Sequence, residues 1–104
     1  MDITIIGAGN LGRKLAKSLS NEEHDVTIID IVPRVVENLV DKLDIQGICG
    51  CATHINVLKE AGVSTSQLVI ATTESDENNI LICLIAKKLG ARKTIARVRN
   101  PEYN

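Results

Sequence analysis

The sequence predicts an α/β fold in which a doubly wound parallel sheet of about five strands carries helices on both faces. Three observations predict it. Short apolar runs alternate with helical patterns along the whole chain, as in successive βαβ units. A glycine-rich turn follows the first apolar run, and an acid, Asp30, closes the second. The residues are 44% apolar and 1% aromatic, so the core is aliphatic, as suits a parallel sheet buried on both sides.

The first half of the chain is expected to hold three strands and two helices. Residues 1–6 form an apolar strand, and residues 10–21 form a helix with one apolar face. Residues 25–29 form the second strand, which ends at the acid. Pro33 suits the first turn of a second helix, because proline needs no amide partner there. Residues 45–49 form a short third strand.

The second half adds a short helix, two strands and one long helix. We expect the short helix at residues 54–61 and the strands at residues 67–71 and 94–98. Thr73-x-x-Asp76 resembles a capping box with Asp in place of Glu, and it opens the long helix to Leu89. Right-handed connections then give the strand order 3-2-1-4-5.

The turn Gly7-Ala8-Gly9-Asn10-Leu11-Gly12 matches a dinucleotide-binding fingerprint, with a strand before it and a helix after it. This context predicts a Rossmann-like fold. Gly7 permits the tight turn, Gly9 lets the backbone approach a pyrophosphate, and Gly12 lets the helix pack closely. Free amides at the helix N-terminus would bind the phosphates.

Asp30 is expected to accept hydrogen bonds from the hydroxyls of a ribose. Its carboxylate would repel a 2′-phosphate, and Ile31 and Val32 bring no compensating cation. Arg34 stands close enough to soften this repulsion but not to overturn it. The sequence therefore favours NAD over NADP.

Charge and composition exclude several classes of partner. The 12 basic and 13 acidic residues are interspersed, and the net charge is −1, so no basic field attracts nucleic acid. The sequence has no leader and no apolar run of membrane-spanning length, so we expect a cytoplasmic domain without direct membrane insertion.

The three cysteines lack the spacing of a disulfide framework. Cys49-x-Cys51-x-x-His54 offers three metal ligands, but a structural zinc site needs four. We therefore expect no metal site, and reduced, partly buried thiols. The polar residues 76–79 are interpreted as helix capping rather than as a cation site.

Three further segments resemble one family. They are Gly50-Cys51-Ala52-Thr53, residues 71–79 and residues 95–103. With the glycine loop, they resemble the N-terminal nucleotide-binding (KTN or RCK) domain of Trk-type potassium-uptake regulators, over essentially all 104 residues. The resemblance implies a cytoplasmic regulator that binds NAD(H) or an adenine nucleotide (ATP, ADP or AMP). It also implies an integral-membrane potassium transporter or channel as partner, at the inner face of the membrane.

The resemblance assigns ligand contacts residue by residue. The glycine loop would hold the diphosphate and Asp30 the ribose, with Arg97 within reach of the phosphates. Residues 51–53 would lie beside the adenine, and residues 71–74 near the other half of the ligand. The candidate site residues are Gly7, Ala8, Gly9, Asn10, Leu11, Gly12, Asp30, Ile31, Arg34, Cys51, Ala52, Thr53, Ala71, Thr72, Thr73, Glu74 and Arg97.

Two residues depart from the family pattern. Many members carry Asp where this chain has Cys51, which changes a polar contact near the adenine. Many also carry Arg where this chain has Asn10. Without that cation a triphosphate is less favoured, and a dinucleotide more so.

The helix at residues 78–89 contains the unbroken apolar run 80–86, which indicates that both of its faces are covered. Either neighbouring helices of one subunit cover it or a second subunit does. We favour the subunit interface, and the family resemblance implies a homo-oligomer.

Three function classes fit a nucleotide-binding domain. We expect a ligand-sensing regulatory domain that is not an enzyme, with residues 1–104 a fragment of a longer regulator. The alternative is the cofactor half of an NAD-dependent oxidoreductase, which would need a substrate domain and a positioned acid or base. A methyltransferase that uses S-adenosylmethionine is the third, and the segments around Thr53 and Thr73 argue against it.

Overall fold

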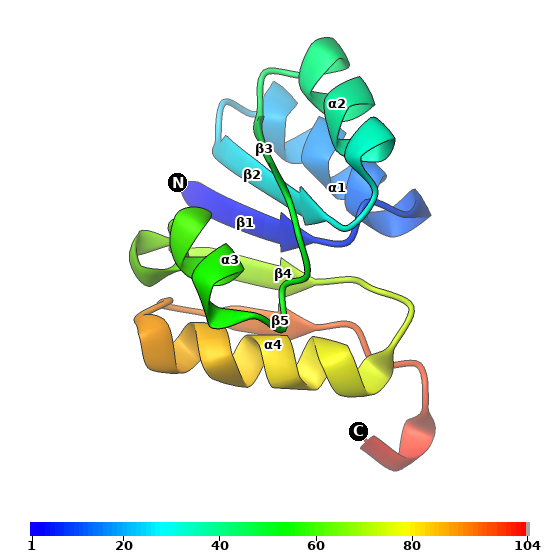
Figure 1. Ribbon diagram of the computed structural model, residues 1–104, viewed down its shortest axis with the longest axis vertical. Helices are drawn as coiled ribbons and strands as arrows, with labels where there is room; N and C mark the ends of the chain where they lie inside the picture. Colours follow the sequence, from blue (N-terminus) through cyan, green and yellow to red (C-terminus); the bar gives the residue numbers. More distant parts are fainter. Residues whose placement is uncertain (104) are drawn as a thin grey trace.

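A five-stranded parallel sheet forms the centre of the computed structural model, which describes residues 1–103 (Figure 1). The strand order β3-β2-β1-β4-β5 confirms the predicted topology. Every neighbouring pair of strands is parallel. The strands are β1 (Asp2–Ile6), β2 (Asp25–Asp30), β3 (Gln46–Cys49), β4 (Leu68–Ala71) and β5 (Thr94–Ala96).

Four α-helices cover the two faces of this sheet. They are α1 (Asn10–Asn21), α2 (Pro33–Lys42), α3 (Ile55–Glu60) and α4 (Asp76–Leu89), with short 3₁₀ turns at Val63–Thr65 and Pro101–Tyr103. Helices α1 and α2 pack on one face and α3 and α4 on the other. The doubly wound prediction is therefore confirmed.

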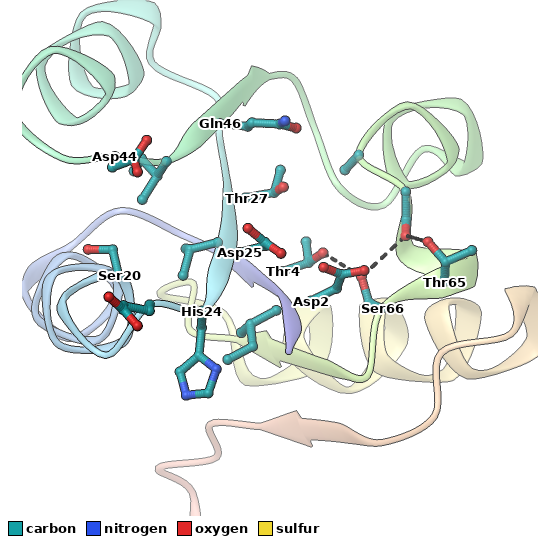
Figure 2. Close-up of a pocket in the computed structure, with 16 residues that line it drawn as sticks. Asp2, Thr4, Ser20, His24, Asp25, Thr27, Asp44, Gln46, Thr65 and Ser66 are labelled. Atoms are coloured by element: carbon teal, nitrogen blue, oxygen red, sulfur yellow. Dashed lines mark hydrogen bonds between the residues drawn. The ribbon is translucent and has the colours of Figure 1, made fainter.

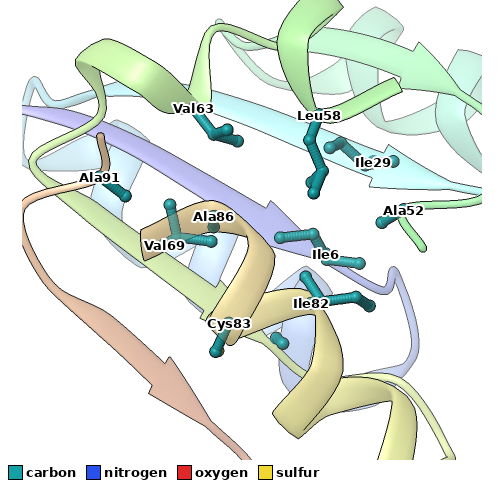
Figure 3. Packing of buried hydrophobic residues seen from close by; sticks show 11 residues of the cluster. Ile6, Ile29, Ala52, Leu58, Val63, Val69, Ile82, Cys83, Ala86 and Ala91 are labelled. Atoms are coloured by element: carbon teal, nitrogen blue, oxygen red, sulfur yellow. The ribbon is translucent and has the colours of Figure 1, made fainter. Parts of the chain in front are cut away.

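Each face of the sheet has its own aliphatic core, because successive side chains of a strand point to opposite faces. Ile5 and Ile28 point toward α1 and α2 and are fully buried. Ile6 and Ile29, one residue further along each strand, point toward α3 and α4 (Figure 3). The two cores leave the carboxyl ends of the strands free for the loops that carry the site.

The long helix is capped two residues later than the predicted capping box at Thr73 places it. Its N-cap is Ser75, whose Oγ accepts a hydrogen bond from the amide of Asn78 at 3.1 Å. The capping box at Thr73 is wrong, because the hydroxyl of Thr73 instead donates to Oδ1 of the buried Asn79 at 2.6 Å. Gly90 ends the helix with a φ of +120°, as its position after the last turn predicted.

Helix α4 buries only one of its faces within the chain. Ile82 and Ala86 pack on the sheet, whereas Leu84 is 60% exposed and Leu81 is 45% exposed. Neighbouring helices of the same chain therefore do not cover both faces, and that interpretation is wrong. Coverage by a second copy stays a prediction.

The last strand is shorter than residues 94–98, because the chain leaves the sheet after Ala96. In the part of the chain described, no helix is long and apolar enough to cross a membrane.

Candidate functional site

The glycine loop connects β1 to α1 and is packed as its spacing predicts. Gly7 has a φ of +98°, where a side chain is strained. A Cβ at Gly12 would overlap the carbonyl group of Gly7, so only glycine lets α1 approach the loop this closely. A Cβ at Gly9, in contrast, would meet nothing within 4 Å. Gly7 and Gly12 therefore serve the fold, and Gly9 faces open space.

A cleft of about 500 Å³ lies beside this loop, where the loops that follow β1, β2, β3 and β4 converge. The order of the strands places it at the topological switch point between β1 and β4, the usual ligand position in such sheets. Of the predicted residues, it is lined by Gly7, Ala8, Gly9, Asp30, Ile31, Cys51, Ala52, Thr53, Thr72, Thr73 and Glu74.

Six predicted residues are not part of the cleft lining. Asn10 and Leu11 begin α1, and Gly12 is buried beneath the loop. Ala71 is fully buried in the core on the side of α3 and α4. Arg34 and Arg97 complete this group. The structure adds eight lining residues that the sequence reasoning did not name as contacts: Ile6, Ile29, Val32, Val35, Gly50, Ser75, Asn78 and Ile82.

Asp30 connects β2 to the glycine loop. Its Oδ1 accepts a hydrogen bond from the amide of Ala8 at 2.9 Å, and its Oδ2 accepts one from the amide of Val32 at 3.0 Å. Each carboxylate oxygen can accept more than one bond. Asp30 can therefore fix the loop and still accept bonds from two ligand hydroxyls.

Thr72 lines the cleft and also supports the glycine loop from beneath. Its side chain is buried, and its hydroxyl oxygen lies 3.0 Å from the carbonyl oxygens of both Ile6 and Gly7. The hydroxyl donates to this pair, so it holds β4 against the turn after β1. This role depends on the pairing of β1 with β4, which the predicted strand order already implies.

Cys51 lines the cleft, and its Sγ lies 3.0 Å from the hydroxyl oxygen of Thr53. Hydrogen bonds from the side chain and then the backbone of Thr53 lower the pKa of the Cys51 thiol. Cys49 and Cys51 are both exposed, so the prediction of partly buried thiols is wrong for them; Cys83 is buried, and burial raises its pKa. Among residues 1–103, no cluster of three or more His, Cys, Asp or Glu side chains could hold a metal ion.

Two arginines differ from expectation. Arg97 donates from Nη1 to the carbonyl oxygen of Thr72 at 3.4 Å, so it supports the loop that follows β4. Arg13 is not among the predicted contacts, yet its Nη2 donates to Oδ1 of Asn10 at 2.8 Å and its Nε to the carbonyl oxygen of Gly9 at 3.4 Å. A cation thus stands at the loop although Asn10 replaces the arginine of many family members. The helical spacing from Gly9 to Arg13 was the available signal.

A second hollow, of about 620 Å³, opens at the amino ends of the strands (Figure 2). Asp2, Asp25 and Asp44 line it, and no Lys or Arg is among its lining residues. Thr4 and Ser66 are buried at its base and bond to each other at 2.7 Å. This acidic hollow would repel phosphates. His24 lines it, and neither histidine lines the cleft beside the glycine loop.

Comparison with known proteins gives a consistent result. The sequence model of the TrkA-N domain matches residues 3–104. A Trk system potassium uptake protein TrkA homolog of Archaeoglobus fulgidus is 46% identical over 103 residues, which are 99% of this chain and 23% of that protein. A homolog of the same name from Methanothermobacter thermautotrophicus is 38% identical over 103 residues, 99% of this chain and 48% of that protein. The chain thus spans about a quarter to a half of these relatives.

Solved structures share the fold. The GsuK channel bound to NAD matches with a TM-score of 0.85 at 24% identity, over 98% of this chain and 18% of that chain. The Kef CTD of Shewanella denitrificans in AMP-bound form matches with a TM-score of 0.77 at 21% identity, over 91% of this chain and 57% of that chain. At these identities the likeness concerns the fold alone.

Proposed function

Because the chain belongs to the TrkA-N domain family, we propose that it is a regulatory domain of a potassium uptake system and binds NAD(H) in the cleft beside its glycine loop. In this proposal the domain is cytoplasmic and acts on an integral-membrane potassium transporter or channel. Copies of the domain associate through the exposed face of α4. None of the relatives reported above carries the name of an enzyme, in agreement with a regulatory role.

The observation that carries the proposal is the bond between Asp30 and the amide of Ala8. It holds the ribose-binding acid and the phosphate-binding loop together on one wall of the cleft. The first amides of α1 lie at the end of this loop, where the helix dipole favours an anion. One extended ligand with a ribose and a diphosphate would meet both features at once.

Three observations favour NAD(H) over the other adenylates. Asp30 disfavours a 2′-phosphate, because its carboxylate would repel that group. Asn10 leaves the loop with Arg13 as the cation bonded to it, which suits two phosphate charges better than the greater charge of ATP. The GsuK channel, whose fold this domain shares, is named as bound to NAD. AMP, ADP and ATP are the alternative ligands, since the Kef CTD of the same fold is in AMP-bound form.

Isothermal titration calorimetry tests the proposal. NADH should bind at one saturable site, with weaker binding of NADPH and ATP and no turnover of the nucleotide. Asp30→Asn should weaken NADH binding by about tenfold or more, because hydrogen bonds to a charged group contribute about 1.5–3 kcal/mol. Asp25→Asn, at the other end of the same strand, is the matched control and should bind as the parent does. Absence of heat with every adenylate would refute nucleotide binding.

Crystals grown with NADH and with ATP would then show which ligand fills the cleft. Density in the acidic hollow instead of the cleft would contradict the proposed site. The oxidoreductase alternative predicts a change in the nicotinamide absorbance with some small substrate. Neither histidine lines the cleft, so this alternative would have to draw its acid or base from another residue type.

A further inference from the structure

The segment from Arg97 to Tyr103 leaves the sheet after β5 and lies against the loop between β4 and α4 (Figure 1). Several hydrogen bonds join the two stretches of chain. Oxygens of residues 72–79 accept most of them from donors in residues 97–103. We refer to residues 97–103 as the C-terminal segment and to residues 72–75 as the cleft wall.

Asn79 is the inner of two clamps between these stretches. It is fully buried, and both ends of its amide are bonded. Oδ1 accepts from the amide of Thr73 at 2.9 Å and from its hydroxyl at 2.6 Å. Nδ2 donates to the carbonyl oxygens of Thr73 at 3.1 Å and of Arg97 at 2.9 Å. One side chain therefore fixes the cleft wall and the start of the C-terminal segment in a single arrangement.

Asp76 is the outer clamp. Its Oδ2 accepts hydrogen bonds from the amides of Arg99 at 3.1 Å and Asn100 at 2.8 Å. The guanidinium of Arg99 returns to the cleft wall and donates to the carbonyl oxygen of Glu74 at 2.6 Å. Further along, the hydroxyl of Tyr103 donates to Glu77 at 2.7 Å.

The cleft wall thus has two sides. Thr72, Thr73, Glu74 and Ser75 all line the cleft. The carbonyl oxygens of Thr72 and Glu74 bond to Arg97 and Arg99 on the other side. A ligand that displaces this wall must break or rearrange these bonds, because their donors belong to a different part of the chain.

We propose that Asn79 and Asp76 are positioning residues that couple the nucleotide cleft to the C-terminal segment. Nucleotide binding in the cleft then changes how readily the C-terminal segment detaches from the cleft wall. The inference rests on the proposed nucleotide binding. Such a coupling is reciprocal: if nucleotide binding shifts the segment, then a contact that shifts the segment alters nucleotide affinity by the same factor.

Hydrogen exchange read by mass spectrometry tests the coupling without a ligand first. Asp76→Ala removes the carboxylate that accepts hydrogen bonds from the amides of Arg99 and Asn100. Asp41→Ala is the matched control, because Asp41 is an exposed acid on α2. In Asp76→Ala we expect exchange about tenfold faster in residues 97–103 and also faster exchange at Thr73, whose amide is held by the inner clamp. Faster exchange confined to residues 97–103 would overturn the coupling.

The second arm adds NADH to the parent chain. We expect altered exchange in the glycine loop and in residues 97–103, and an NADH affinity that changes by about threefold or more in Asp76→Ala but not in Asp41→Ala. Protection of the glycine loop with no change in residues 97–103 overturns the coupling and leaves nucleotide binding standing. No change in the glycine loop refutes nucleotide binding, and the coupling with it. Arg99→Ala, which removes the guanidinium bond to Glu74, is the second variant and should shift affinity in the same direction as Asp76→Ala.

Discussion

Replacing Gly9 by alanine should separate binding from folding. Gly9 has φ −75° and ψ −163°, a conformation that alanine adopts without strain, and its Cβ would enter open space. Two effects on stability then oppose each other. Alanine restricts the unfolded chain, which stabilises by about 0.4–1 kcal/mol, and it is a poorer N-cap residue by a similar amount, about 0.5–1 kcal/mol. The free energy of unfolding should therefore change by less than about 0.5 kcal/mol.

Binding should respond strongly to the same methyl group. If the diphosphate passes over Gly9, the new Cβ occupies its path, and we expect NADH affinity to fall by at least about tenfold, or about 1.4 kcal/mol. Urea unfolding gives the stability, and calorimetric titration of the same preparation gives the affinity.

Gly12→Ala is the matched comparison and should show the opposite pattern. Its Cβ would overlap the carbonyl group of Gly7, so α1 must shift away from the loop and the protein should lose about 1–3 kcal/mol or more of stability. A Gly9→Ala variant that binds NADH as tightly as the parent would refute the reasoning, because the ligand would then not cross the loop at this residue.

Three further outcomes are expected. Arg13→Ala should weaken NADH binding by about twofold to tenfold and make the binding less sensitive to salt, because the substitution removes the cation bonded to the glycine loop. Titrations at two ionic strengths measure both effects. An unchanged salt dependence would exclude a contact between Arg13 and a phosphate. The amides of Arg99 and Asn100 donate to Asp76 and lower its pKa. The contribution of Asp76 to stability is therefore complete above the ordinary carboxyl pKa and disappears as the pH falls through the lowered value. The urea midpoint should fall less steeply from pH 6 to pH 2 in Asp76→Ala than in the parent, and parallel curves would contradict this. Iodoacetamide should modify Cys51 before Cys83, because hydrogen bonds lower the pKa of the Cys51 thiol and burial raises the pKa of the Cys83 thiol. Bound NADH should slow the reaction at Cys51. Equal rates with and without NADH would place the ligand elsewhere.

Features encoded by local geometry could be predicted from the sequence. Pro33 begins α2, Gly90 ends α4, and the glycine loop lies between β1 and α1, because each needs only the conformation of a few adjacent residues. The alternation of strands and helices then limits the topology, and right-handed connections give the observed strand order. The ligand contacts were expected from the family resemblance, and eleven of the residues it assigns line one cleft.

Features that depend on distant partners could not be predicted in this way. Thr73 has the sequence context of a cap, but the buried Asn79 takes its hydroxyl and Ser75 becomes the cap. Thr72 is predicted to contact the ligand and does line the cleft, but its hydroxyl donates to the carbonyl oxygen of Ile6 in β1. The strand that begins at Thr94 ends early, because the chain turns toward the N-terminus of α4, where two of its amides donate to Asp76. In each case a side chain meets a partner that is remote in sequence or on another element.

The edges of the sheet bear on how this domain behaves in concentrated solution. Within residues 1–103, the two outermost strands, β3 and β5, are only four and three residues long. Each therefore presents few unpaired backbone groups to a neighbouring molecule, and the last of them ends at Ala96. Short edges of this kind oppose the edge-to-edge growth that leads to fibrous aggregates. Self-association of residues 1–103 should accordingly run through the helices rather than through the edges of the strands.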